Sequence, residues 1–230
     1  QFLLTLLDNV VIHLPKNIKE QEDMPPKVKF DSDSIIDFAF DHVRKNGWDG
    51  LSARYIASEI GSSVGPIYTH FKSMKGLEVA VVNKTLQLFY KYLTTERTGD
   101  KWIDHGIGYV LFAKKESHLF QALFNKNYAN LRKPYDQNIW RSLDEDLADY
   151  APFKALSRGQ IGVIRRGFWV FVHGLASLIT SASLPLEDEK AIVYSVTKAS
   201  EIFLVGIKGD PETMKISDDN HLIRFLADDR

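Results

Sequence analysis

The chain has 230 residues, no cysteine and a formal net charge of −1, with 29 basic and 30 acidic residues. The lack of cysteine excludes disulfides, thiolate metal sites and cysteine nucleophiles. With 44% apolar and 26% charged residues, the composition is that of a globular protein of one large domain or two small ones and excludes a disordered, collagen-like or rod-like chain.

No segment has the pattern of a membrane span or a secretion signal. The apolar run 163–179 is interrupted by Arg165, Arg166 and His173, whereas a spanning helix needs about 20 apolar residues. The first residues lack the basic stretch and cleavage site of a signal peptide. We therefore expect a cytoplasmic, nucleoid-associated protein. We expect residues 1–26 to form an amino-terminal extension, of which 1–23 are either upstream sequence or a short helix.

Residues 27–72 are predicted to form a small domain of three helices. The first begins at an Asp31 or Ser32 cap and ends at Asn46-Gly47. The second begins at Ser52 and ends at Gly61, and the third is capped by Ser63 and ends near residue 71.

The second and third helices have helix-turn-helix proportions. They are joined by Gly61-Ser62-Ser63, and the small Ala57 allows close approach. A helix of eight residues is about 12 Å long, which matches the width of the major groove. Arg54 is placed to bind a guanine edge. Phosphate contacts are expected from Ser52, Tyr68, His70, Lys72 and Lys75.

A long helix capped by Ser73 is predicted to join this domain to a helical bundle over residues 73–230. Its expected helices span residues 101–130, 136–150, 156–183 and 187–208, with a short one over 218–226, and breaks at Lys133-Pro134 and elsewhere. No stretch shows the two-residue alternation of a strand. The predicted fold class is therefore all-α.

Residues 30–82 resemble the amino-terminal domain of the TetR family of bacterial transcriptional regulators. The resemblance is carried by residues 35–40, 46–48, 51–61 and 64–73, including Glu59-Ile60-Gly61 and Tyr68-Thr69-His70-Phe71. It implies an all-helical homodimer with a three-helix DNA-binding head, a linking fourth helix, an effector-binding body and a dimer interface of four helices. By correspondence, the residues that approach bases are Arg54, Ser63, Val64, Pro66 and Thr69.

One position departs from the family pattern. Met74 stands where the resemblance implies a lysine that binds phosphate, and the neighbouring Lys75 lies about 100° further round the helix. We therefore expect a shallower salt dependence of DNA binding than in relatives.

Aromatic residues of the body are predicted to be core or to line an effector cavity. Aromatics make up 12% of the chain, and a bundle this rich in them can enclose an apolar ligand. The candidate pocket residues are Trp102, His105, Phe112, Phe120, Phe124, Tyr128, Phe168 and Phe171.

The last two long helices carry candidate dimer contacts. A heptad seam of Ile192, Val196, Ala199, Phe203 and Gly206 indicates packing against another helix. Small residues on the preceding helix, Gly167, Gly174 and Ser177, allow close approach. The alternative is that both helices face the chain's own core. The resemblance favours a dimer interface.

These observations predict a DNA-binding regulator, a repressor that binds a palindromic operator as a homodimer and is released by a small, largely apolar effector. We expect no catalytic residue, metal or cofactor, and no two histidines stand four residues apart. The alternatives are an effector-binding dimer without DNA function, an architectural DNA-binding protein without a cavity, and a helical enzyme.

Overall fold

The computed structural model describes residues 31–124, 128–184 and 188–208, without the side chains of residues 129 and 133–137. Every regular element in these ranges is a helix, and none of the helices is long and apolar enough to cross a membrane. The predicted extension 1–26 and the predicted helix 218–226 lie outside the described residues. The all-α prediction is confirmed over the described chain.

The head consists of α1 (Ser32–Asn46), α2 (Ala53–Glu59) and α3 (Gly65–Phe71). Two predicted caps are present, because Asp31 accepts a hydrogen bond from the Ser34 amide at 2.8 Å and Ser52 accepts one from the Tyr55 amide at 3.2 Å. The head core contains fully buried side chains from each helix, Ile35, Ile56 and Ile67.

The predicted cap of the third helix is wrong. Val64, not Ser63, precedes α3, and no side chain caps it. The third residue after Ser63, whose amide is a usual donor to a capping side chain, is Pro66, which has no N–H.

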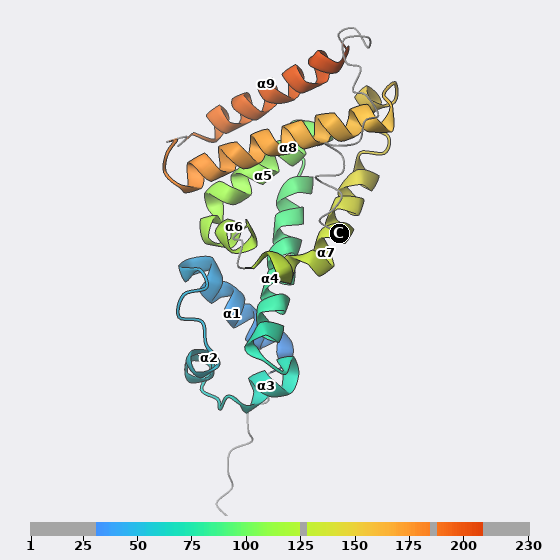
Figure 1. Cartoon of the computed structure of the whole chain (residues 1–230). Helices are drawn as coiled ribbons and strands as arrows, with labels where there is room; N and C mark the ends of the chain where they lie inside the picture. The colour runs from blue at the N-terminus through green and yellow to red at the C-terminus, as the bar shows by residue number, and fades with distance from the viewer. Residues whose placement is uncertain (1–30, 125–127, 185–187, 209–230) are drawn as a thin grey trace, which may run out of the picture.

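The long helix α4 (Met74–Thr94) rises from the head into the body, and its predicted Ser73 cap accepts from the Gly76 amide at 3.1 Å. The body contains α5 (Lys101–Lys115), α6 (Ser117–Phe124), α7 (Ala129–Asp146), the 3-10 turn η1 (Ala151–Phe153), α8 (Arg158–Thr180) and α9 (Glu189–Lys208). In Figure 1, α8 and α9 lie across the end of the molecule opposite the head.

The body differs from the sequence prediction at two places. The expected helix 101–130 is divided at Glu116 into α5 and α6, and α7 continues through Lys133-Pro134 where a break was expected. Pro134 lies in the second turn of α7, where it removes one amide donor, but the helix continues past it to Asp146.

The head and body meet at α1 and α6. Arg44 Nε donates to Glu116 Oε2 at 2.6 Å, and a second guanidinium nitrogen donates to the other carboxylate oxygen. Tyr92 OH donates to Glu116 at 3.3 Å. Next to this pair, Trp48 stacks on Tyr128 with ring centroids 4.7 Å apart. The end of α1 is therefore held directly to the body.

Candidate nucleic-acid interface and body cavity

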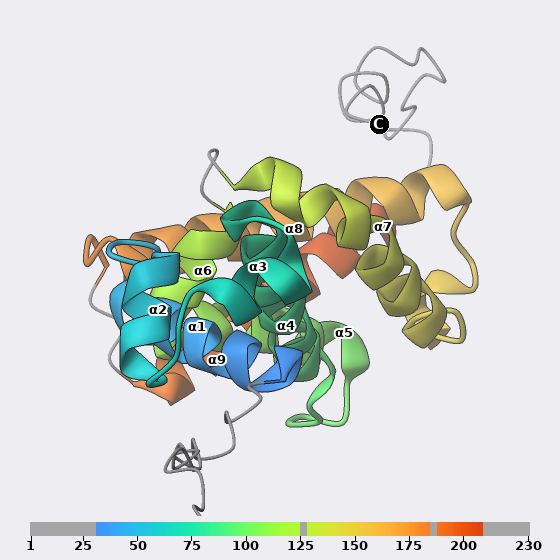
Figure 2. The same ribbon diagram turned by 90° about the horizontal axis from the view of Figure 1, so that it is seen from below.

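The turn between α2 and α3 fixes the orientation of the two helices. Gly61 has φ 65°, a left-handed conformation that glycine adopts at little cost. The Ser62 amide donates to the Ala57 carbonyl at 2.8 Å, a bond that closes a helix end. Ala57 is buried and lets the helices approach closely. Seen from below, α2 and α3 lie at the tip of the molecule (Figure 2).

The side chains predicted to contact bases lie on this tip. Arg54, Ser63, Val64 and Thr69 are exposed, and Pro66 is half-buried. Thr69 Oγ1 donates to the Gly65 carbonyl at 2.9 Å, so its oxygen remains able to accept. The structure therefore brings together all five residues on α2, α3 and the turn between them.

The predicted phosphate contacts lie around the same tip. Ser52, Tyr68, His70, Lys72 and Lys75 are all exposed. Lys72 ends α3 in a left-handed conformation with φ 64°, and its Nζ donates to the Thr69 carbonyl at 3.2 Å. These side chains form a polar and basic rim around α3.

Two positions in the first turn of α4 govern how α3 meets that helix. Met74 is half-buried and packs against the hydrophobic core, so it offers no group to a phosphate. A Cβ at Gly76 would lie 2.1 Å from the Phe71 carbonyl oxygen. Glycine is therefore required where the end of α3 rests on α4.

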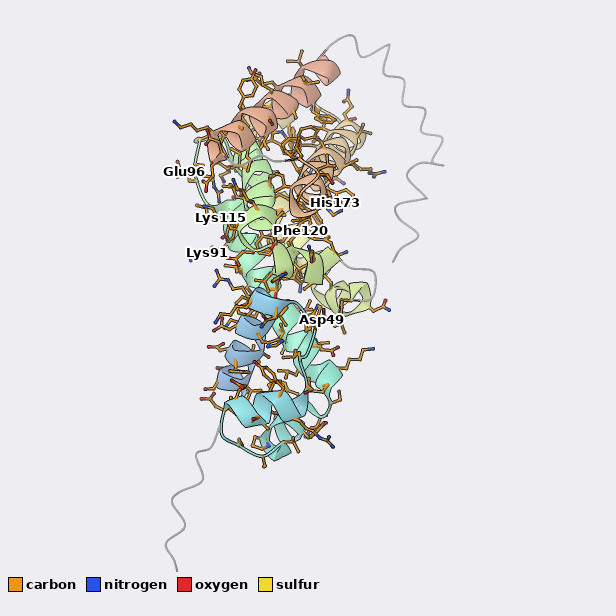
Figure 3. The ribbon with its side chains drawn as sticks, turned by 90° about the vertical axis from the view of Figure 1, so that its left-hand side faces the viewer. Asp49, Lys91, Glu96, Lys115, Phe120 and His173 are labelled. Atoms are coloured by element: carbon orange, nitrogen blue, oxygen red, sulfur yellow. The ribbon has the colours of Figure 1, made fainter. Side chains whose placement is uncertain are left out.

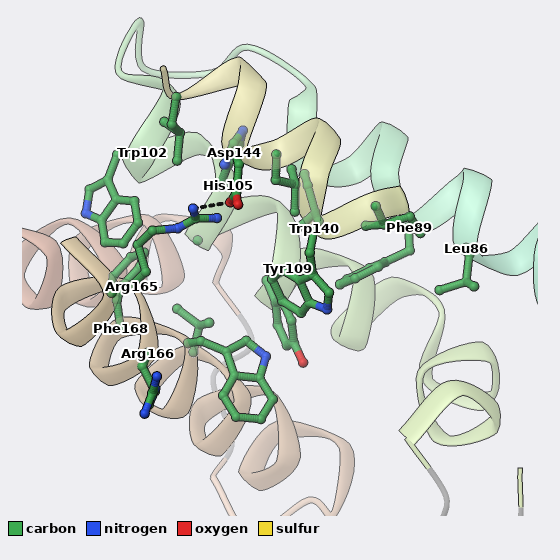
Figure 4. Close-up of a pocket in the computed structure, with 18 of the residues that line it drawn as sticks. Leu86, Phe89, Trp102, His105, Tyr109, Trp140, Asp144, Arg165, Arg166 and Phe168 are labelled. Carbon is green, nitrogen blue, oxygen red and sulfur yellow. Dashed lines mark ion pairs between the residues drawn. The ribbon is translucent and has the colours of Figure 1, made fainter. Parts of the chain in front are cut away.

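A cavity of about 600 Å³ lies within the body. Its wall comes from α4, α5, α6, α7 and α8 and is mostly apolar and aromatic (Figure 4). The aromatic lining residues are Phe89, Trp102, Tyr109, Phe124, Trp140, Phe168 and Trp169. A volume of this size lies within the range of about 300–1,000 Å³ for small-molecule sites.

Half of the predicted pocket residues line this cavity, namely Trp102, His105, Phe124 and Phe168. The other four do not. Phe112 and Phe120 are buried in the core, Tyr128 packs on Trp48 and Phe171 is half-buried away from the cavity wall. Helical periodicity identifies an inward face, but it does not tell which inward residues meet an empty space.

The sequence prediction missed the polar part of the wall. The charged lining side chains are Arg132, Arg165, Arg166 and Asp144. The sequence does contain a signal for these polar groups, because Arg165 and Arg166 interrupt the longest apolar run of the body. Charged side chains are rarely buried without a partner, so two adjacent arginines within an apolar run are a sign that polar groups line part of the interior.

Hydrogen bonds tie the polar groups of the wall to α7. Arg165 forms an ion pair with Asp144 across the cavity (Figure 4). His105 Nε2 lies 2.9 Å from Asp146 Oδ2. Burial lowers the pKa of His105 and outweighs the opposing effect of Asp146. The ring is therefore held neutral near pH 7, and the arginines carry the positive charge of the wall.

A second polar pair links Tyr109 of the cavity wall to His173 of α8. Tyr109 OH and His173 Nδ1 form a hydrogen bond of 2.8 Å. Burial raises the pKa of the Tyr109 hydroxyl, and burial, together with the Arg132 charge, lowers the pKa of His173. Phe120 packs beside His173, with ring centroids 5.8 Å apart (Figure 3). Both groups are uncharged near neutral pH.

The predicted heptad seam of α9 faces the chain's own body. Ile192, Val196 and Ala199 are buried within the single chain. Phe203 packs on Phe168 and lies so close to Gly167 that a Cβ there would be 2.6 Å from its ring. Ile192, Val196 and Ala199 are therefore covered within the single chain, whereas Phe203 and Gly167 are only half-buried. Of the other predicted contacts, Gly174 and Gly206 are exposed and Ser177 is half-buried.

A different face of α8 and α9 exposes large apolar side chains. On α8 they are Val163, Val170 and Leu178, and on α9 they are Tyr194, Ile202 and Val205. Five of them range from 47% to 69% exposed, and Val163 is 37% exposed. An apolar surface spread over two long helices is typical of a protein–protein contact.

Comparisons with known proteins agree with this architecture. Residues 35–81 match the family described as bacterial regulatory proteins, tetR family. The structure is similar to the crystal structure of a proposed TetR-family transcriptional regulator from Rhodococcus sp., with a TM-score of 0.55 and 17% identity over 75% of this chain and 97% of that one. No curated protein matches the sequence significantly. Residues 35–81 thus match a model of the tetR family, and the described chain shares the fold of that crystal structure.

Proposed function

We propose that the protein is a ligand-responsive repressor that binds a palindromic operator as a homodimer and releases it when a small effector enters the body cavity. The observation that carries this proposal is the course of α4. Its first turn supports the end of α3 through Gly76, and its later turns contribute Leu86, Phe89 and Leu93 to the cavity wall. A single helix thus connects the DNA-reading tip to the cavity.

A second connection runs through α6. Phe124, at the end of α6, lines the cavity, while Glu116, immediately before α6, binds Arg44 of α1. An effector that displaces Phe124 would move the helix to which the head is attached. In thermodynamic terms, the effector stabilises a head position different from the one that binds DNA.

The homodimer in this proposal uses the exposed apolar face of α8 and α9. A two-fold axis between two such faces would bury Val170 and Ile202 of both copies. The two α3 helices would then contact two operator half-sites about 34 Å apart, or further apart if the operator is longer. No catalytic role is part of the proposal.

The test is a selection of bound duplexes from genomic DNA by the purified protein, followed by affinity measurements on the recovered sequence. The wild-type protein should enrich a palindromic site. Arg54→Ala should lose most of the enrichment, whereas Arg158→Ala, on an exposed arginine at the start of α8, should retain it. Failure of the wild-type protein to enrich any duplex would contradict the proposal.

A further inference from the structure

The body cavity meets the solvent at α7. Every described lining residue of α4 is buried, and so are Trp102 and Tyr109 of α5, so this side of the cavity is closed. Among the described lining residues, only Trp140, which is 41% exposed, and Asp144, whose side chain is 56% exposed, are exposed. They stand four residues apart on α7 and therefore lie on one face of that helix. A residue that lines a cavity and is also exposed marks the mouth of the cavity.

An ion pair spans this mouth from α8. The guanidinium of Arg165 binds the carboxylate of Asp144, and the pair joins α8 to α7 (Figure 4). Both residues line the cavity, so the pair lies at the boundary between the cavity and the solvent. Gly162, one turn before Arg165 on α8, also lines the cavity, and a Cβ there would have no atom within 4 Å. Free space therefore lies directly beside the ion pair.

The backbone that carries Asp144 is fixed by contacts with α5. Lys101 Nζ lies 2.9 Å from Asp146 Oδ1, and His105 Nε2 lies 2.9 Å from Asp146 Oδ2. Asp146 follows Asp144 by two residues, so this end of α7 is tied to the closed side of the cavity. Opening the ion pair therefore needs only the rotation of two partly exposed side chains, which takes picoseconds to nanoseconds, and no movement of a helix.

We infer that Arg165 and Asp144 form a latch at the mouth of the body cavity, and that a ligand enters and leaves between α7 and α8 while this pair is open. Because the side chains rotate faster than a bound ligand leaves, the association and dissociation rates both scale with the fraction of time for which the latch is open. A partly exposed ion pair favours its closed state by a factor of about two to five. The latch controls passage into the cavity and does not depend on the proposed effect of a ligand on DNA binding.

The experiment follows the exchange of a neutral fluorescent probe, N-phenyl-1-naphthylamine, with the full chain. Three of the four tryptophans, Trp102, Trp140 and Trp169, line the cavity, so energy transfer from them to the probe reports its binding. Stopped-flow mixing gives the association rate, and mixing the complex with excess β-cyclodextrin, which captures free probe, gives the dissociation rate. Asp144→Asn should raise both rates by about two- to fivefold and leave Kd nearly unchanged.

The second partner of the latch gives an independent check. Arg165→Gln should have the same effect as Asp144→Asn, and the double variant should be no faster than either single variant, because the same pair is lost in all three. Salt screens a partly exposed ion pair. Added sodium chloride should therefore speed dissociation of the probe from the wild-type protein more than from Asp144→Asn.

The matched control is Glu189→Gln, which removes the ion pair between Lys115 of α5 and α9, outside the wall of the body cavity, and should exchange the probe at wild-type rates. A retained Kd shows that a variant is folded with its cavity intact. The inference is overturned if the wild-type protein does not bind the probe, if Asp144→Asn exchanges it at wild-type rates, or if the two substitutions multiply each other's effect. A change in the dissociation rate alone would also overturn it, because the pair would then hold the ligand and not the passage. A loss of duplex binding by the wild-type protein would instead contradict the proposed function and leave these rates unaffected.

Discussion

At the scale of single residues, a buried carboxylate joins the head to the body. Glu116 is 4% exposed and is bound by Arg44 of α1 and by Tyr92 of α4. Because the guanidinium of Arg44 donates to both carboxylate oxygens of Glu116, the contact is bidentate and has a fixed orientation. The Arg44 side chain is 47% exposed, so solvent weakens the attraction.

Replacing Arg44 with methionine should lower the free energy of unfolding by about 1–3 kcal/mol, because Glu116 would remain buried without its main donor. The lower part of this range is expected, since Arg44 is partly solvated and Tyr92 still donates. Urea unfolding measures the effect. Lys45→Met, on the exposed next residue of α1, is the control, and equal stability of the two variants would contradict the prediction.

The histidine behind the cavity should make stability depend on pH. Burial, with the charge of Arg132, lowers the pKa of His173 below its usual 6.5. As pH falls through that value, the unfolded chain takes up the proton before the folded chain does, so stability present at higher pH is lost. His105, whose pKa burial also lowers, acts in the same direction.

The free energy of unfolding of the wild-type protein should therefore decrease from about pH 7.5 to about pH 5.5. His173→Asn, which keeps an acceptor for Tyr109, should reduce that decrease, whereas Gln87→Asn, on an exposed position of α4, should leave it unchanged. Chemical unfolding at a series of pH values measures both. A His173→Asn profile as steep as the wild type would contradict the assignment.

At the scale of the elements, the first turn of α4 sets the salt response of the head. Met74 is half-buried there, whereas Lys75 is exposed. Met74→Lys should add one phosphate contact and make the slope of log affinity against log salt steeper by about 0.9. Operator affinity measured over a salt series tests this, with Gln87→Lys on an exposed turn of α4 as control. An unchanged slope for Met74→Lys would falsify the prediction.

The helices of the head could be predicted closely from sequence because their signals are local. Asp31, Ser52 and Ser73 each cap the helix that follows, as expected from residue type and spacing. The segment against which a helix face packs is not predicted by such local signals. The heptad residues Ile192 and Val196 of α9 do pack, but they are buried against the chain's own body. A repeat indicates that a helix packs, and it does not identify the chain against which it packs.

The same limit applies to the cavity. Trp102 and Phe168 were predicted among its residues and line it, whereas Phe112 is equally aromatic and equally inward but is surrounded by other side chains. The empty volume depends on how α4, α5, α7 and α8 are spaced in three dimensions. The periodicity of a sequence does not specify that spacing between helices.

At the scale of the whole molecule, the proposed dimer depends on two helix faces. Val170 of α8 is 58% exposed and Ile202 of α9 is 69% exposed. Their removal from water on association provides the hydrophobic driving force. Two linked heads bind a palindrome more tightly than one, because the second head binds at a high effective concentration.

Ile202→Asp combined with Val170→Asp should yield a monomer in sedimentation experiments and weaken operator binding by about a hundredfold or more. Gln87→Asp, on an exposed position of α4, should change neither property. A variant with both aspartates that still sediments as a dimer would show that another surface joins the two copies.

The continuity of α4 also has a mechanical consequence. The helix has 21 residues, so it behaves as a lever about 32 Å long. A tilt of about 5° imposed at the cavity end would displace the opposite end by about 3 Å, close to the rise of one base pair. A movement at the cavity that is no larger than a thermal fluctuation can thus shift α3 out of register with the major groove of DNA.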